Sequence, residues 1–154
     1  MKISSNSSVS LIKFHWAHVH LMNLREFERK YFEWFPNYED MLRTYASCET
    51  SATALYNGDV ACCFGAVPIW KGVAEAWILT SYIVERNPIS LTRGALRYFD
   101  NIATDMQLHR LQIVVDSSNL LALRWAKALK FEHEGLLRGY GPDGSNHYML
   151  ARYY

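Results

Sequence analysis

Three histidines close together form the densest group of potential metal ligands in the sequence. They are His15, His18 and His20. Imidazole is a common zinc ligand, but no Cys, Asp or Glu follows at the spacing of a known zinc motif. We therefore expect no metal site here. We expect the three side chains either to line a cleft for a substrate or to be exposed to solvent.

Cysteine and serine are the next candidates for chemistry. Cys62 and Cys63 are adjacent in a segment typical of an apolar strand, where burial raises the pKa of a thiol and lowers its reactivity. With Cys48 they make an odd count of three, which gives neither a disulfide framework nor a Cys-x-x-Cys metal pair. Ser117 and Ser118 lack the flanking glycines of a nucleophile elbow and are expected as helix caps. We expect neither residue type to act as a nucleophile.

The composition limits the classes of function. A chain of 154 residues with 50% hydrophobic residues can bury one core, so we expect a single domain over residues 1–154, with residues 1–8 as a flexible start. A net charge of +1 offers no field for nucleic acid or for an anionic membrane. The apolar runs are too short to span a membrane, and the start lacks a signal peptide's apolar region. We expect a cytoplasmic protein.

The spacing of apolar residues predicts the elements that position these groups. We expect strands over residues 9–14, 51–56, 60–70, 73–81, 110–115, 135–140 and 147–153, and helices over residues 24–35, after Asn37, from Pro88 and after Ser117 or Ser118. The dipeptide Asn57-Gly58 is a strong signal for a hairpin between the second and third strands. The fourth strand is apolar at nearly every position except Glu75, which indicates a central strand covered on both faces.

The long helix after the fourth strand has a marked start. Asn87 is the expected N-cap, and Pro88 suits the first helical position because its missing N–H costs nothing there. Since a crossover through a helix joins parallel strands, we expect the strands over residues 73–81 and 110–115 to be parallel. The core face of the last helix is expected to carry Leu121, Trp125, Ala128 and Leu129.

A stretch of the second half resembles a known family. Residues 111–119 read Leu-Gln-Ile-Val-Val-Asp-Ser-Ser-Asn, followed by Ala122, Leu129-Lys-Phe131, Glu134-Gly135 and Arg138. This stretch and the order of the elements resemble the GNAT superfamily of N-acetyltransferases. The resemblance implies an α+β fold of α/β/α type. Helices would flank a mixed, mostly antiparallel sheet of six to seven strands whose central parallel pair is splayed.

The resemblance also implies how acetyl-CoA would be held. In the family the pantetheine arm enters the gap between the fourth and fifth strands, and the pyrophosphate lies at the start of the next helix. Unpaired N–H groups and the helix dipole make such a start a favourable anion site. The implied cofactor-binding residues are Ile78, Leu79, Thr80, Arg86, Ile89, Ser90, Leu91, Arg93 and Asn119.

The chemistry implied is direct attack of a neutral amine on the thioester, with a base that takes the amine's proton. Glu75 is the candidate base, because the family often keeps a carboxylate in its fourth strand. The alternative for Glu75 is a structural role, either as a strand carboxylate at the rim of the sheet or as one paired with an arginine. Tyr140, expected in the penultimate strand, is the candidate acid, and its alternative is a hydrogen-bonded packing residue.

Two departures from the family's pattern keep a second hypothesis open. Residues 85–94 lack the glycine pair of the family's phosphate loop, so side chains stand where a backbone would approach a phosphate closely. Ala126 stands at the position that often holds a tyrosine acid, and alanine cannot donate a proton.

Two functions therefore compete. The first is an acetyl-CoA-dependent N-acetyltransferase whose partners are a coenzyme A thioester and an unidentified amine acceptor, with neither nucleic acid nor membrane; a homodimer stays open. The second is a catalytically degenerate binding or assembly protein, similar to GNAT-like proteins of bacteriophages, some of them virion-associated. An open gap between the parallel strands favours the first function, and a gap plugged by Trp77 or Trp125 favours the second.

Overall fold

The computed structural model describes residues 9–154; the start that we expected to be flexible, residues 1–8, lies outside the described residues. The strands are β1 (Val9–Lys13), β2 (Ala52–Tyr56), β3 (Asp59–Trp70), β4 (Val73–Thr80), β5 (Arg110–Asp116), β6 (Glu132–Leu137) and β7 (His147–Tyr153). The helices are the 3-10 helix η1 (Trp16–Leu21) and α1 (Glu26–Glu33), α2 (Tyr38–Ser47), α3 (Ile83–Arg86), α4 (Pro88–Asp105) and α5 (Leu120–Ala128). The expected order is confirmed, and η1 and α3 are additions.

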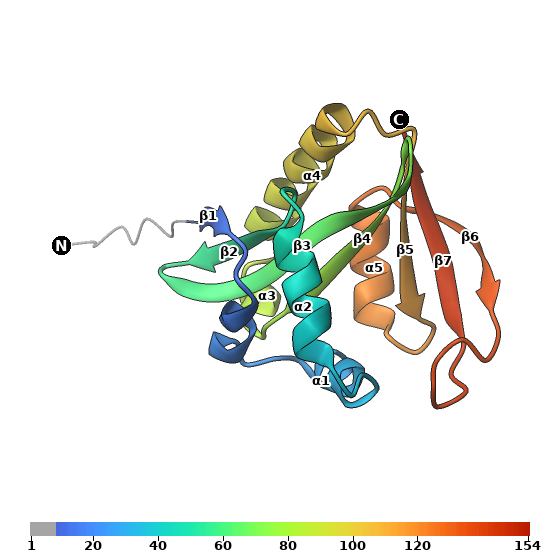
Figure 1. Ribbon diagram of the computed structural model, residues 1–154, viewed down its shortest axis with the longest axis horizontal. Coiled ribbons are helices and arrows are strands. Elements are labelled where there is room, and N and C mark those ends of the chain that lie inside the picture. Colours follow the sequence, from blue (N-terminus) through green and yellow to red (C-terminus); the bar gives the residue numbers. More distant parts are fainter. Residues whose placement is uncertain (1–8) are drawn as a thin grey trace.

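The seven strands form one mixed sheet in the order β1-β2-β3-β4-β5-β7-β6 (Figure 1). Neighbouring strands are antiparallel except β4 and β5, which are parallel. Helices cover both faces of this sheet. The expected α+β fold, with a mostly antiparallel sheet and one central parallel pair, is confirmed.

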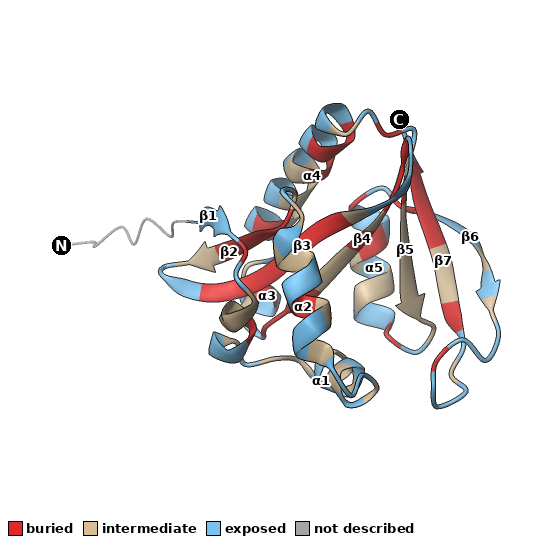
Figure 2. Cartoon of the chain, viewed as in Figure 1, coloured by how far each residue is buried: buried red, intermediate tan, exposed pale blue. Residues whose placement is uncertain are grey.

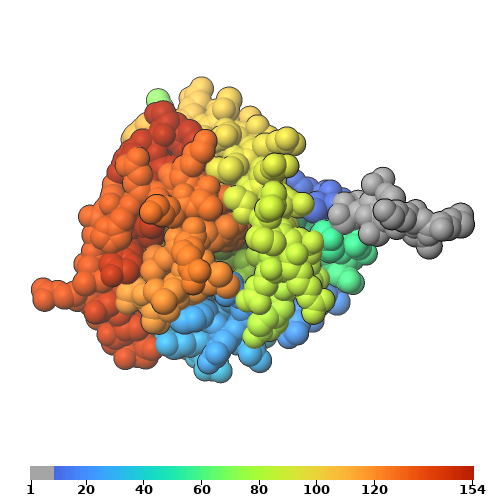
Figure 3. Space-filling view, turned by 180° about the vertical axis from the view of Figure 1, so that it is seen from behind, coloured from blue at the N-terminus to red at the C-terminus, as the bar shows by residue number. Residues whose placement is uncertain are grey.

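Different helices cover the two faces of the sheet. On one face Leu42 of α2 packs in a core cluster with Cys63 of β3 and Leu79 of β4. On the other face Phe99 of α4 packs with Leu111 of β5, and α5 joins the same cluster. Buried residues are concentrated on the central strands (Figure 2). Seen from behind, α4 and α5 lie side by side with a hollow between them (Figure 3).

The parallel pair β4 and β5 is joined only at its first residues. The register runs from Val73 opposite Arg110 to Glu75 opposite Gln112. Beyond Glu75 the two strands separate, while β4 stays paired with β3 and β5 stays paired with β7. This is the splayed pair that the resemblance implied, and it opens a gap in the centre of the sheet.

Two local signals in the sequence are confirmed. Asn57 and Gly58 have φ of 50° and 89°, the left-handed values that a tight hairpin turn requires and that these residue types adopt at low cost. Pro88 occupies the first turn of α4. Asn87 is the N-cap, but its side-chain amide donates to the Ile83 carbonyl at 3.4 Å instead of capping α4.

The predicted cap of α5 was wrong, and its predicted core face was right for Trp125 and Leu129 only. The cap is Asn119, whose Oδ1 accepts from the Ala122 N–H at 3.2 Å, while Ser118 donates to Asp116 through both its N–H and its hydroxyl. The buried residues of the helix end are Ala126 and Leu129, whereas the expected face residues Leu121 and Ala128 are exposed. Because α5 is apolar around most of its circumference, spacing alone could not identify the face that packs on the sheet.

The boundaries of β6 also differ from the prediction. The strand begins at Glu132 and ends at Leu137, not over residues 135–140. Its first residues, Glu-His-Glu, favoured a loop in the sequence, but an edge strand tolerates charged side chains because it is open to water. As a consequence Tyr140 lies in the loop between β6 and β7.

Candidate functional site

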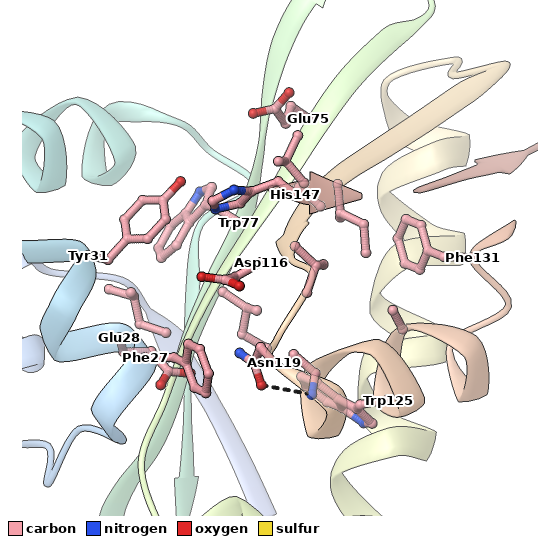
Figure 4. A pocket seen from close by; sticks show the side chains of 18 of the residues that line it. Phe27, Glu28, Tyr31, Glu75, Trp77, Asp116, Asn119, Trp125, Phe131 and His147 are labelled. Atoms are coloured by element: carbon pink, nitrogen blue, oxygen red, sulfur yellow. Dashed lines mark hydrogen bonds between the residues drawn. The ribbon is translucent and has the colours of Figure 1, made fainter. Parts of the chain in front are cut away.

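A pocket of about 200 Å³ lies where β4 and β5 separate. Residues 75–79 of β4 and 113–116 of β5 border it on two sides, α1 and α2 lie over it on one face of the sheet, and α4 and α5 lie over it on the other. Figure 4 shows Glu75, Trp77, Asn119, Trp125 and His147 around this space. The pocket therefore passes through the sheet at the position where the resemblance implied a cofactor.

The edge of β4 that faces the pocket carries unpaired backbone groups. The Ser81 N–H donates to the Ala61 carbonyl of β3 at 2.9 Å. Successive residues of a strand direct their backbone groups to opposite edges, so those of Leu79 point to β3 and those of Ile78 and Thr80 point to the gap. The Thr80 carbonyl accepts from the Arg25 N–H at 3.4 Å, which leaves the Thr80 N–H and both groups of Ile78 for a ligand.

The start of α4 offers fewer donors than its three predicted residues suggest. The Leu91 N–H donates to the Asn87 carbonyl at 3.3 Å, and the Leu91 side chain is buried. The N–H groups of Ile89 and Ser90 have no acceptor within the helix, because they belong to its first turn. These residues lie outside the pocket lining.

The two predicted arginines are exposed and lie on either side of this helix start. Arg86 ends α3 and Arg93 lies in the second turn of α4. Neither forms an ion pair with another residue of the range 9–154. They are cations available to an anion at the helix start.

Asn119 lies at the opposite wall of the pocket from β4. It is 9% exposed, and its Oδ1 is used to cap α5. Its Nδ2 forms no hydrogen bond with the residues that the structure describes, so the amide can donate to a ligand. The residue thus combines a structural bond with a free donor at the pocket surface.

Glu75 lies at the apex of the gap, in the last residue pair that joins β4 to β5. Its carboxylate is half-buried and accepts from Gln112 Nε2 at 2.9 Å. Its hydrogen-bonding partner is therefore glutamine and not arginine. A carboxylate bonded to a neutral donor therefore lies at the head of the pocket.

Tyr140 does not line the pocket. Its side chain is 53% exposed, and its ring packs on His147 with the centroids 5.1 Å apart. The tyrosines of the lining are Tyr31 of α1 and Tyr45 of α2. Burial, helped by the nearby Tyr140, Tyr45 and Glu75, raises the pKa of Tyr31 to about 12, so this phenol stays protonated at neutral pH.

Most residues of the α1 and α2 wall were not predicted as site residues. Phe27 and Tyr31 of α1 and Trp34, the C-cap of that helix, line the pocket, and their spacing of four and three residues is a helical stripe that could have been recognised. Tyr45 stacks on Trp77 with ring centroids 4.5 Å apart. No local pattern marks His147, the first residue of β7, as a pocket residue.

Two of the three N-terminal histidines form hydrogen bonds within the chain. His15 Nδ1 accepts from the Ala17 N–H at 3.1 Å, and His18 Nδ1 lies 2.8 Å from the Thr53 hydroxyl. Burial and the neighbouring His15 lower the pKa of His18. Within residues 9–154 no group of His, Cys, Asp and Glu is arranged to hold a metal ion, and none of the three histidines lines the pocket.

Thiol labelling of the native protein at pH 8 is expected to modify Cys48 and to spare Cys62 and Cys63. Burial raises the pKa of Cys63 to about 11 and also raises that of Cys62, and only the thiolate reacts. Mass spectrometry after iodoacetamide treatment measures the sites, with labelling in urea as the control in which all three react. Equal labelling of Cys48 and Cys63 in the native protein would contradict the burial described.

None of the helices in the described part of the chain is long and apolar enough to cross a membrane.

Comparison with known proteins finds similarity at the level of structure. No family model matches the chain, and no curated protein matches it. Among solved structures, a GNAT-family acetyltransferase from Bacillus anthracis superposes with a TM-score of 0.74 at 14% identity, covering 94% of each chain. Ard1 from Thermoplasma volcanium gives 0.75 at 14% identity, covering 94% of this chain and 97% of that one. The structure of yncA from Salmonella typhimurium, which contains its cofactor acetyl-CoA, gives a TM-score of 0.73 at 11% identity. The match covers 94% of this chain and 93% of that one.

Proposed function

We propose that this chain, whose fold is that of the GNAT-family acetyltransferases, transfers an acetyl group from acetyl-CoA to an amine. The observation that carries the proposal is the open gap between β4 and β5, with unpaired backbone groups along its β4 edge. An unpaired strand edge is costly unless a ligand or water pairs with it. The amides of a pantetheine arm are suited to pair with such an edge, as another strand would.

Residues on three elements would hold the cofactor. The backbone of Ile78 and Thr80 faces the gap and would pair with the pantetheine amides, Leu79 supplies an apolar side chain, and Asn119 would donate from the opposite wall. The N–H groups of Ile89 and Ser90 would take the pyrophosphate, since they are free and lie at the positive end of the α4 dipole. The predicted donor Leu91 contributes packing below this site.

Two side-chain cations support the same site. Arg86 and Arg93 are exposed beside the helix start and would neutralise the phosphate charge. Without the glycine pair, side chains keep the backbone N–H groups farther from a phosphate. The long arginine side chains can still reach that phosphate and so offset part of the lost binding.

Glu75 is the proposed catalytic base. When bound, acetyl-CoA supplies a thioester whose carbonyl carbon the amine attacks, so that the C–N bond forms and the C–S bond breaks. The Glu75 carboxylate takes the proton that the amine loses, directly or through one water molecule. Tyr140, which we proposed as the acid for the departing thiolate, lies at the rim against His147, while Tyr31 and Tyr45 are the phenols inside the pocket.

A plugged gap would favour the alternative, a degenerate binding protein. Trp77 is stacked against Tyr45 on one side, and the Trp125 indole donates to the Thr92 hydroxyl of α4 at 2.9 Å on the other. Both rings line the pocket without filling it. The solved structures named above give no support to the bacteriophage likeness. We propose the cytoplasm as the compartment, on the ground of the odd number of free thiols.

Isothermal titration with acetyl-CoA tests this function. We expect micromolar binding to the wild type and at least about tenfold weaker binding to Asn119→Ser, since serine keeps the helix cap but lacks the amide donor. We expect Ile78→Pro to weaken binding as well, because it removes an N–H that faces the gap while each β4 N–H that faces β3 is kept.

A matched variant controls for general effects of the substitution. Asn101→Ser changes an exposed asparagine of α4 and is expected to leave the affinity for acetyl-CoA unaltered. If the wild type shows no binding at millimolar acetyl-CoA, the acetyltransferase proposal fails and the degenerate alternative is preferred.

A further inference from the structure

The side of the pocket under α1 and α2 is an aromatic cleft. Tyr31 of α1 and Trp34, the C-cap of that helix, lie with their ring centroids 5.7 Å apart. Tyr45 of α2 stacks on Trp77 with the ring centroids 4.5 Å apart and the ring planes at 15°. All four side chains line the pocket and none is fully buried. We call these four residues the aromatic cleft. It offers flat apolar surface to a ligand, which is how proteins bind aromatic groups.

Glu75 belongs to the same side of the sheet. Side chains of a strand alternate between faces, so Glu75 shares the face of Trp77, which is the face under α2. An amine bound in the aromatic cleft would therefore meet the carboxylate that we propose as its base. This step rests on the proposed function.

The charge of the pocket is negative. Its lining contains the carboxylates of Glu28, Glu75 and Asp116 and the single cation Lys30. The Lys30 ammonium lies 2.8 Å from Asp143 of the β6–β7 loop, and this bond holds the pKa of the Asp143 carboxyl well below its usual range. The one ammonium is thus already neutralised. A ligand carboxylate would find no free cation here, whereas a ligand ammonium is attracted by the carboxylates and by the ring faces.

An unused hydrogen-bonding group lies at the other end of the cleft. His147 is 2% exposed and lines the pocket, and its ring lies 6.2 Å from that of Trp34. Its Nδ1 is enclosed with no hydrogen-bonding partner among residues 9–154, and no bond to its Nε2 is formed there either. A buried polar group is costly without a partner, so an unpaired imidazole in a pocket points to a ligand that supplies one.

We propose that the acceptor is an aromatic primary amine that carries a phenol-type hydroxyl and no carboxylate. Its ring lies between the side chains of the aromatic cleft, its amine is directed to Glu75, and its hydroxyl pairs with His147. Figure 4 shows Glu75, Tyr31 and His147 bordering the same central space. The carboxylates of the lining attract the amine as an ammonium and repel any acceptor that carries an acid group.

Titration with three matched probes tests this acceptor class. Tyramine contains the ring, the amine and the hydroxyl; L-tyrosine adds a carboxylate; isoamylamine keeps the amine and lacks the ring. We expect tyramine to bind at least about tenfold more tightly than either of the others. Equal binding of L-tyrosine overturns the exclusion of a carboxylate, and equal binding of isoamylamine overturns the role of the aromatic cleft.

Two histidine variants test the hydroxyl contact. His147→Phe is expected to lower the affinity for tyramine about tenfold. Its affinity for 2-phenylethylamine, which lacks the hydroxyl, is expected to stay within about twofold of the wild-type value. His133→Phe, at an exposed position of the neighbouring strand β6, is the control and is expected to change neither affinity. An unchanged affinity of His147→Phe for tyramine overturns this contact.

The titration of the wild type with acetyl-CoA, carried out beside the probe titrations, separates the two proposals. If acetyl-CoA does not bind but the probes bind in the expected order, the acetyltransferase function fails and the acceptor class stands as a binding site. If acetyl-CoA binds and the probes do not follow this order, the acceptor class fails and the acetyltransferase function stands.

Discussion

Glu75→Gln is expected to lower kcat by about 100-fold or more and to leave KM for acetyl-CoA within about twofold. Glutamine has nearly the same shape, and its side-chain oxygen can still accept from Gln112 Nε2, so the apex of the gap is expected to keep its geometry. What the variant loses is the capacity to take a proton, because an amide is not a base. Thiol release from acetyl-CoA with tyramine as the acceptor measures the rate.

A second glutamate separates the role of Glu75 from a general effect of charge. Glu132→Gln removes a carboxylate from the exposed edge strand β6 and is expected to keep the wild-type rate. Should Glu75→Gln retain most of the wild-type kcat while binding acetyl-CoA normally, Glu75 would not be the base.

Leu111→Ala is expected to lower the free energy of unfolding by about 2–5 kcal/mol. Leu111 is 0% exposed and lies opposite Ala74, where β4 and β5 are still joined. Its neighbours in the core include Ala66 and Ala74, whose side chains cannot extend into the space that the leucine leaves. The loss of apolar contact is thus accompanied by a cavity that the surroundings cannot fill.

Urea denaturation measures this change as a shift of the midpoint at constant m-value. Leu136→Ala is the matched control, since Leu136 lies on β6 and is 45% exposed. This substitution is expected to lower the free energy of unfolding by at most about 0.5 kcal/mol. A loss below about 1 kcal/mol in Leu111→Ala would show that the strand junction closes around the smaller side chain.

Most of the secondary structure could be predicted because its signals are local. The turn at Asn57-Gly58 and the helix start at Pro88 depend on the backbone preferences of the residues themselves. The parallel pairing of β4 and β5 follows from the helical crossover that joins them. The short helices η1 and α3 were missed, since one or two turns of helix contain too few residues to show a period.

The placement of Tyr140 and Leu79 at the site depends on strand boundaries and register, which local patterns do not determine. Tyr140 was assigned to a strand that ends at Leu137, so its side chain points elsewhere than expected. Leu79 was grouped with Ile78 and Thr80 as one backbone ligand, although alternate residues of β4 face opposite edges. Which of them faces the gap depends on the pairing of β4 with β3, and that pairing is a contact between residues distant in the chain.

The sequence by itself determined the order of the elements, the parallel pair at the centre of the sheet, and the resemblance from which Glu75 and Asn119 were selected. Only the tertiary structure decided that Tyr31, Tyr45, Trp77 and His147 border one pocket with them, and that Lys30 is neutralised by Asp143. The physical reason is the range of the interactions involved. Turns, caps and periodicity act between neighbours in the chain, whereas a pocket is made where α1, α2, β4, β5 and β7 converge from separate parts of the sequence.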